Sequence, residues 1–335
     1  MKLKQLLALV LLVSLVALLP AVSLAEDTIV WKYAHMNAPE NLSGRYAQYL
    51  SDRIFEESNG ALKIEIYPSS QLGTMQEQAE MVSTGVVQMH HNTWGTLSVL
   101  FNDLEVLDTP YLTTSVEDHI KLNDINNSPL MIEFNKQLIE KAGVRILGCV
   151  FGGSRSLTCN KPIYSPADLK GVKIRAIPSQ VYITAVEGMG AIPIAIDWAE
   201  VPTALATGVA EGQENPPVTF YSAKLYEYQK YWMDTRHIKA MGPFVVNEAA
   251  FQALSPELQQ IVLDVSAETV EKFNALGIQE EQEYLDKILA TGMTFIGVEQ
   301  GLKLDEFKAS VDALVAVNYA KYAEYYKQIN EYLGY

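Results

Sequence analysis

The sequence predicts an α/β protein built from two structural units. Short strand-like runs alternate with amphipathic helical runs along most of the chain, which is typical of parallel sheets covered by helices. The chain has 335 residues. About 310 of them remain beyond an N-terminal leader, which is a length that fits two domains. The alternating pattern starts afresh at Gly152, and we expect the second unit to begin there.

The leader has the pattern of a secretion signal. A positively charged start precedes the apolar run Leu6–Leu19, and the small residues Ser23 and Ala25 suit a cut after position 25. The apolar run is shorter than the roughly 20 residues that cross a bilayer. We therefore expect a cleaved Sec signal peptide over residues 1–25. The alternative is a retained membrane anchor. No cysteine follows the cut, which argues against a lipoprotein, and a freely diffusing exported protein is best retained in a periplasm.

The charge of the chain excludes one class of partner. The formal net charge is −15 at pH 7, so nucleic acid is an improbable ligand. An acidic protein binds an anion only where a local arginine makes the electrostatic potential positive against the negative net charge of the chain. The few arginines are therefore the residues to follow: Arg45, Arg53, Arg145, Arg155, Arg175 and Arg236.

The first unit holds alternating strands and helices. Leu62–Tyr67 alternates apolar and polar residues, as a strand with one solvated face does, and Gly60 and Gly85 are placed to end helices. The expected strands are Thr28–Ala34, Leu62–Tyr67, Val86–His91 and Val144–Phe151, and the expected helices are Asn41–Asn59, Thr74–Thr84, Val116–Asn126 and Pro129–Ala142.

The second unit repeats this alternation. Ser165 and Pro166 have the pattern of an N-cap followed by proline at the first helical position. The expected helices are Pro166–Lys170, Gln180–Met189 and Trp198–Thr207, and the expected strands are Val172–Ala176, Val209–Glu211 and Phe244–Val246.

The C-terminal third is mostly helical. A run from Ser255 to about Leu289 has apolar residues at helical spacing and would be about 50 Å long, so it would have to lie along both units. Gly277 inside it is either a bend or a tolerated glycine. The last region, Leu304–Leu333, is rich in tyrosine, and we favour a packing face over a binding face there.

Two arginines of the second unit are the main candidates for binding an anion. Gly152, Gly153 and Ser154 predict a glycine-rich turn that projects Arg155. Arg175 lies in a strand among apolar residues, where an unpaired charge is very costly. Its partner is either one of the protein's own acids or a ligand, and the sequence leaves both open. A guanidinium makes planar, two-point contacts with a carboxylate.

The run GGSRSLTCNKPIYSPADLKGVKIRAIPS at 152–179, followed by WAEVPTALATGVAEGQENP at 198–216, resembles the DctP-type solute-binding proteins of TRAP (tripartite ATP-independent periplasmic) transporters. The resemblance extends more weakly over the mature chain, including IEIYPSSQLG at 64–73. It implies a two-lobed periplasmic-binding-protein fold that is class II-like, with lobes joined by crossing strands and a long helix. It also implies that the protein binds a small carboxylate and delivers it to TRAP membrane subunits, without enzymatic activity or a cofactor.

The resemblance also assigns site residues. The family's strand arginine, which makes the two-point contact with the ligand carboxylate, matches Arg175. The remaining family positions in the second unit match Arg155, Asn215 and Trp198. In the first unit the matches are weaker and fall on Asn37, Asn92, Thr93 and Trp94. A sialic-acid-binding branch has an acidic residue where this sequence has Thr93, which argues against sialic acid as the ligand.

The expected lobes are discontinuous in sequence. We expect lobe I to comprise residues 26–152 plus about 241–280, and lobe II to comprise residues 153–240 plus about 281–335. Closure of the two lobes over the ligand would exclude water and strengthen the ion pair.

Several alternatives remain open. An extracytoplasmic sensor that presents its ligand to a receptor kinase would share the same binding chemistry. His90 and His91 are adjacent on a strand and point to opposite faces, so a metal site is not expected. Cys149 and Cys159 form either a disulfide or two buried thiols.

Overall fold

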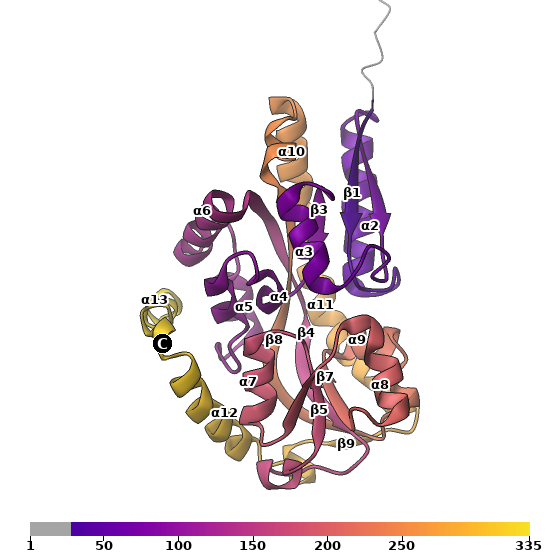
Figure 1. Cartoon of the computed structure of the whole chain (residues 1–335), viewed down its shortest axis with the longest axis vertical. Coiled ribbons are helices and arrows are strands. Elements are labelled where there is room, and N and C mark those ends of the chain that lie inside the picture. The colour runs from indigo at the N-terminus through magenta and orange to yellow at the C-terminus, as the bar shows by residue number, and fades with distance from the viewer. Residues whose placement is uncertain (1–27) are drawn as a thin grey trace, which may run out of the picture.

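The computed structural model describes residues 28–335, and the signal peptide expected over residues 1–25 lies outside the described residues. The chain forms a two-lobed α/β structure, as the sequence predicts. In Figure 1 one group of strands and helices, which includes β1, β3, α2 and α3, lies above a second group that includes β5, β7, α7 and α8. Long elements, β4, β8 and α11, run between the two groups. Within the described residues no helix is long and apolar enough to cross a membrane.

All described strands belong to one mixed sheet. The strand order is β2-β1-β3-β8-β4-β7-β5-β6, and β9 pairs with β8 off this path. The shorter strands are β1 Ile29–Ala34, β2 Leu62–Tyr67, β3 Met89–His91, β5 Lys173–Ala176, β6 Ile192–Ala195, β7 Gly212–Asn215 and β9 Thr294–Ile296. Strands β1, β2 and β3 attach at one end of the long pair β4–β8, and β5, β6 and β7 attach at the other.

The two long strands differ from the sequence prediction. Strand β4 is Val144–Cys159 and β8 is Tyr231–Asn247, so each extends well beyond the strands expected at 144–151 and 244–246. The prediction of a glycine-rich turn at Gly152–Ser154 is wrong, because the backbone of these residues is part of strand β4. A register shift between Phe151 and Ser154 absorbs the glycines as a bulge, and Gly153 has a φ of +104°. Pairing with β8 keeps this segment extended.

Helix α11, Pro256–Ala290, supports the middle of β4. The helix is unbroken at Gly277. A Cβ there would lie 2.1 Å from the carbonyl oxygen of Phe151, so this glycine permits a close approach between helix and strand. Asn274 Oδ1 accepts a hydrogen bond from the Phe151 amide at 2.7 Å, and Glu281 Oε1 accepts one from the Ser154 amide at 2.8 Å. The helix therefore satisfies backbone groups that the bulge leaves unpaired.

The remaining helices cover the sheet. They are α2 Leu42–Glu57, α3 Met75–Thr84, α4 Trp94–Leu97, α5 Val116–Leu122, α6 Pro129–Ala142, α7 Gln180–Gly188, α8 Val201–Thr207, α9 Pro217–Ser222, α10 Glu248–Gln252, α12 Leu304–Asn318 and α13 Ala323–Leu333. Short 3-10 turns are η1 Asn102–Asp108, η2 Pro166–Leu169, η3 Trp198–Glu200, η4 Leu225–Glu227, η5 Val298–Gln300 and η6 Ala320–Tyr322. Most expected helices are present with shifted ends, but the last is divided into α12, η6 and α13.

The C-terminal tyrosines form a packing face, as the sequence predicts. Tyr319 and Tyr322 are buried, and their hydroxyls donate to the carboxylate of Glu105 at 3.2 and 3.0 Å. Tyr325 donates to Asp103 at 2.7 Å. These contacts tie the C-terminal segment to η1, while α12 packs on α7.

The two cysteines are free, buried thiols. Cys149 and Cys159 lie on the same strand, β4, and at about 3.3 Å per residue they are about 33 Å apart along it. A disulfide requires Cα atoms within about 7 Å of each other. Because β4 continues from Val144 to Cys159, the two cysteines are too far apart for a disulfide, and of the two alternatives in the sequence analysis the structure has the buried thiols.

Candidate ligand-binding site

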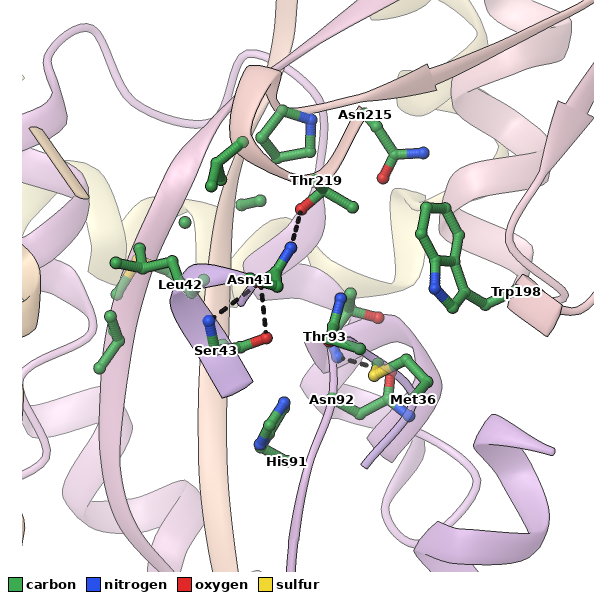
Figure 2. Close-up of a pocket in the computed structure, with 18 of the residues that line it drawn as sticks. Met36, Asn41, Leu42, Ser43, His91, Asn92, Thr93, Trp198, Asn215 and Thr219 are labelled. Carbon is green, nitrogen blue, oxygen red and sulfur yellow. Dashed lines mark hydrogen bonds between the residues drawn. The ribbon is translucent and has the colours of Figure 1, made fainter. Parts of the chain in front are cut away.

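A cavity lies between the two groups of elements, beside the long strands (Figure 2). The side chains that line it come from both groups. The first group supplies Met36, Asn37, Asn41, Leu42, Ser43, Tyr46, Met75, His91, Asn92 and Thr93, and the second supplies Arg155, Arg175, Ile177, Trp198, Asn215, Pro216, Val218 and Thr219, with Val150, Gly152, Ala240, Met241 and Gly242 of β4 and β8 between them.

Arg175 is a buried cation that has no carboxylate partner among the described residues. It lies on β5, its residue is 1% exposed, and it lines the cavity. Its Nε donates to the carbonyl oxygen of Ile196 at 2.9 Å, but Nη1 and Nη2 have no hydrogen-bond partner in this part of the chain. Burial lowers the pKa of Arg175 to about 10, so the group is still charged at neutral pH. The fork of the guanidinium is free to receive an anion.

Arg155 has the opposite status. Its Nη2 donates to Oε1 of Glu214 at 2.7 Å, and its Nε donates to Oε2 of the same buried carboxylate. His237 Nε2 also lies 3.1 Å from Glu214 Oε2. Burial alone would raise the pKa of Glu214, but Arg155 and the hydrogen bond with His237 outweigh it and lower that pKa to about 2. Arg155 therefore lines the cavity as one half of an ion pair.

Asn215 and Trp198 stand beside Arg175. Asn215 ends β7, the strand next to β5, and its side-chain amide is held by Gln213 on the same strand. The indole of Trp198 lies 5.8 Å from the guanidinium carbon of Arg175, within cation–π range. Figure 2 shows the Trp198 ring and the Asn215 side chain on the same side of the cavity.

Three of the four residues expected in the first unit reach the cavity. Asn37, Asn92 and Thr93 line it, whereas Trp94 does not. The Trp94 side chain is fully buried in the core of its own group, and its indole N–H donates to Asn123 at 2.7 Å. The reason is local: Thr93 caps helix α4, and the chain turns Trp94 inward at the first helical position.

Several lining residues were missed in the sequence. Asn41 caps α2 and accepts hydrogen bonds from the amide and hydroxyl of Ser43. An N-cap pattern was readable at Asn41, but only the fold brings this helix start to the cavity. His91 was not among the expected site residues, although it lines the cavity. Glu214 belongs to the GQENP motif and was not assigned, although it is the partner of Arg155.

His91 forms part of a buried aromatic cluster on the first group's wall. Its Nδ1 lies 3.0 Å from the Tyr33 hydroxyl, and its ring stacks on His35 at 4.6 Å between centroids. Burial, together with the neighbouring His35 and His90, holds the pKa of His91 well below its ordinary value. Nε2 is buried and has no partner among the described residues, while the ring lines the cavity. His91 is thus a neutral imidazole whose Nε2 has no hydrogen-bond partner among the described residues.

Hydrogen bonds cross from one group of elements to the other around the cavity. Asn41 of α2 donates to Ser222 of α9 at 3.0 Å. The Met75 amide, at the start of α3, donates to Asp197 at 3.1 Å. Gln76 Nε2 donates to the carbonyl oxygen of Pro178 at 2.6 Å. The structure is therefore a closed arrangement in which the two groups touch over the cavity.

The cavity has few charged groups and no metal-binding cluster. Of the residues described, only the two arginines bring charge to its lining. Residues 28–335 contain no group of three or more His, Cys, Asp or Glu side chains placed to hold a metal ion. What the site offers is one unpaired cation, neutral hydrogen-bonding groups and apolar side chains, which suits reversible binding of an anion.

Comparison with known proteins agrees with this reading of the site. Residues 33–322 match the DctP family of bacterial extracellular solute-binding proteins, family 7, and the chain belongs to that family. It is a solute-binding protein rather than an enzyme.

Individual relatives cover most of the chain. The 2,3-diketo-L-gulonate-binding periplasmic protein YiaO of Escherichia coli K12 is 33% identical over 270 residues, which are 80% of this chain and 79% of that protein. The C4-dicarboxylate-binding protein DctP of Rhodobacter capsulatus is 30% identical over 278 residues, 81% of this chain and 80% of that protein. A TRAP periplasmic solute-binding protein of Actinobacillus succinogenes, solved with bound L-galactonate, is 30% identical with a TM-score of 0.84, and the match covers 91% of this chain and 99% of that one.

Proposed function

We propose that this protein binds a small organic acid in the periplasm and delivers it to the membrane subunits of a TRAP-type transporter. The observation that carries the proposal is the unpartnered guanidinium of Arg175, buried at the wall of the cavity. A buried charge without a partner costs several kcal/mol or shifts its pKa. A carboxylate that accepts two parallel hydrogen bonds from Nη1 and Nη2 would remove this cost. The acids named for the relatives support the same class of ligand.

In this proposal each predicted residue that lines the cavity has a role set by its place, and Trp94, which does not line it, has none. Arg175 anchors the carboxylate, and Trp198 and Asn215 flank the anchor. Arg155 forms part of the cavity wall and presents the dipole of its ion pair to the ligand. It adds no net charge, because Glu214 neutralises it. Asn37, Asn92 and Thr93 contact the rest of the ligand from the first lobe.

Closure links binding to delivery. In this proposal lobe I comprises residues 26–152 plus about 241–280, lobe II comprises residues 153–240 plus about 281–335, and the two lobes close over the ligand. The bonds of Asn41, Met75 and Gln76 across the cavity form only when the lobes meet. A ligand that contacts both lobes binds the closed form better and shifts the population toward it. The membrane subunits then receive the closed form. Export through the signal peptide at residues 1–25 places the protein in the periplasm.

A thermal-shift screen over organic acids tests the proposal, because a ligand that binds only the folded state raises its melting temperature. Calorimetry then compares the wild type with Arg175→Ala, and Arg53→Ala on the outer surface of α2 serves as the matched control. We expect the loss of Arg175 to weaken binding by at least tenfold. A smaller loss for the true ligand, or unchanged binding, would show that Arg175 is not the anchor.

A further inference from the structure

We propose that the cavity selects a monocarboxylate whose far end carries a neutral hydrogen-bonding group, above all a hydroxyl, and that it rejects a dicarboxylate of the same length. This inference rests on the proposed function, since it takes Arg175 as the carboxylate anchor. It goes further because it assigns His91 to the other end of the ligand and fixes the number of negative charges the ligand carries.

The charged side chains that line the cavity limit how many negative charges the ligand can carry. Arg155 and Arg175 are the charged side chains that line the cavity within the described residues. The Glu214 carboxylate, 0% exposed, cancels Arg155 through contacts at Nε and Nη2. One positive charge is therefore left to be matched, and it sits at Arg175. One carboxylate on the ligand neutralises the site, whereas two leave an excess negative charge.

Among residues 28–335, the lining on the side of His91 includes no charged side chain that could pair with a second carboxylate. His91 lies on β3, and β8, β4 and β7 separate this strand from β5, which carries Arg175. In Figure 2 the His91 ring and the Asn215 side chain lie on opposite sides of the group of residues drawn. The other polar residues on the side of His91 are neutral as well, among them Ser43, Asn92 and Thr93.

His91 itself is held neutral by its surroundings. The ring is 1% exposed, it stacks on His35 at 4.6 Å, and Tyr33 is bonded to its Nδ1. A proton on Nε2 in addition to Nδ1 would place a cation against a second imidazole in a buried site. Burial and the neighbouring His35 and His90 keep the pKa of His91 well below its ordinary value. The groups that face it, Tyr33, Tyr46 and His35, carry no compensating negative charge.

Nε2 of His91 is buried and has no hydrogen-bond partner among the described residues, so it still needs one. Nε2 donates a hydrogen bond when the Tyr33 hydroxyl donates to Nδ1, and it accepts one when Nδ1 carries the proton. A ligand hydroxyl both donates and accepts, so it satisfies Nε2 in either tautomer. A carboxylate accepts only, and it would lose its hydration without meeting a cation, which costs far more than one hydrogen bond returns.

Apolar side chains also line the cavity. Leu42, Met75, Val150 and Met241 face the cavity and are buried. They suit the carbon chain of the ligand rather than a further charged group. The site therefore has a cationic group at Arg175 that pairs with the ligand carboxylate, apolar side chains that suit its carbon chain, and a neutral polar group at His91.

Matched pairs of acids test the inference in the wild-type protein. In each pair a terminal hydroxymethyl group is replaced by a carboxylate: 4-hydroxybutyrate and succinate, threonate and tartrate, gluconate and glucarate. We expect the hydroxy acid of the best-binding pair to bind at least tenfold more tightly by calorimetry. A dicarboxylate that binds as tightly as its hydroxy partner, or more tightly, overturns the inference.

Two variants separate this inference from the proposed function. His91→Phe retains the aromatic ring and removes Nε2. It should weaken the preferred hydroxy acid about tenfold and leave the analogue without the terminal hydroxyl, such as butyrate for 4-hydroxybutyrate, within about twofold. Equal losses for both ligands contradict the role of Nε2. If His91→Phe does not fold, the wild-type pairs still decide the question.

Arg175→Gln reports on the proposed function alone. If a dicarboxylate is preferred and Arg175→Gln abolishes its binding, the selectivity inference fails and the anchor stands. If no acid of any pair binds and the wider screen of organic acids is also negative, the proposed function and the inference fail together.

Discussion

Arg155 and Arg175 line one cavity, yet only Arg155 is paired with a carboxylate of the protein. Arg155 donates to Glu214 from two nitrogens, while both terminal nitrogens of Arg175 lack partners among the described residues. Both residues are almost fully buried, at 3% and 1% exposed. Arg155 thus stabilises the ligand-free protein through its ion pair. Arg175 keeps an unpaired charge that a bound anion can neutralise. The difference gives the two arginines opposite expected effects on stability.

Replacing each arginine by methionine tests this contrast. Arg155→Met leaves the buried Glu214 without its guanidinium and should lower the free energy of unfolding by about 3–5 kcal/mol. Arg175→Met removes an uncompensated buried charge and breaks only the bond to Ile196, so the ligand-free protein should be as stable as the wild type or more stable. Chemical denaturation without ligand measures both.

The same two variants should differ again when ligand is present. Arg175→Met should lose the rise in melting temperature that ligand gives the wild type. A large loss of stability in ligand-free Arg175→Met would mean that the protein itself satisfies this guanidinium.

Asp108 predicts a specific dependence of stability on pH. Its Oδ2 accepts from the Gly95 amide and the Tyr182 hydroxyl, and burial raises its pKa to about 6. The folded protein therefore binds this proton more tightly than the unfolded chain, so the contribution of Asp108 to the free energy of unfolding falls as pH rises from about 4 to 6. Asp108→Asn has no titrating carboxyl at this position and therefore lacks this pH-dependent contribution to stability. Its stability relative to the wild type should rise by roughly 1–3 kcal/mol across that window.

Denaturation at a series of pH values checks this prediction. Asp264→Asn, at an exposed position on α11, is the control for replacing a carboxylate by an amide at the surface. A difference for Asp108→Asn that is flat between pH 4 and 6 would rule out the buried, proton-binding carboxyl.

Gln76 tests the closing contacts without touching the cavity lining. Its Nε2 donates to the Pro178 carbonyl across the two groups of elements. Gln76→Ala should weaken ligand binding about three- to tenfold, the worth of one hydrogen bond, because it destabilises only the closed form. Calorimetry measures the loss, and small-angle scattering should show a larger open fraction at subsaturating ligand. Gln282→Ala, on the exposed face of α11, should change neither quantity.

The cysteines give a chemical test of the long strand. Cys149 and Cys159 are buried and far apart on β4. We expect two thiols to react with a maleimide in denaturant without reductant, and neither to react quickly in the folded protein. Protein purified from the periplasm with no free thiols would contradict the extended course of β4.

Local pattern predicted most of the elements. Strand β2 and helix α6 have the predicted bounds because alternation, glycine at the helix end and proline at the first turn act over a few residues. The course of β4 through Gly152 and Gly153 was not predictable in this way. Pairing with β8 and bonds from Asn274 and Glu281 of α11 hold these glycines in a strand, and those partners lie far away in sequence.

The sequence by itself determined the α/β class, the two units, the long helix and the motifs that carry Arg155, Arg175, Trp198 and Asn215. Only the tertiary structure decided which arginine is paired, that His91 and Asn41 face the cavity, and that Trp94 does not. The physical reason is that pairing and burial depend on which groups meet in space. A guanidinium has the same chemistry at positions 155 and 175, and only the position of Glu214 distinguishes them.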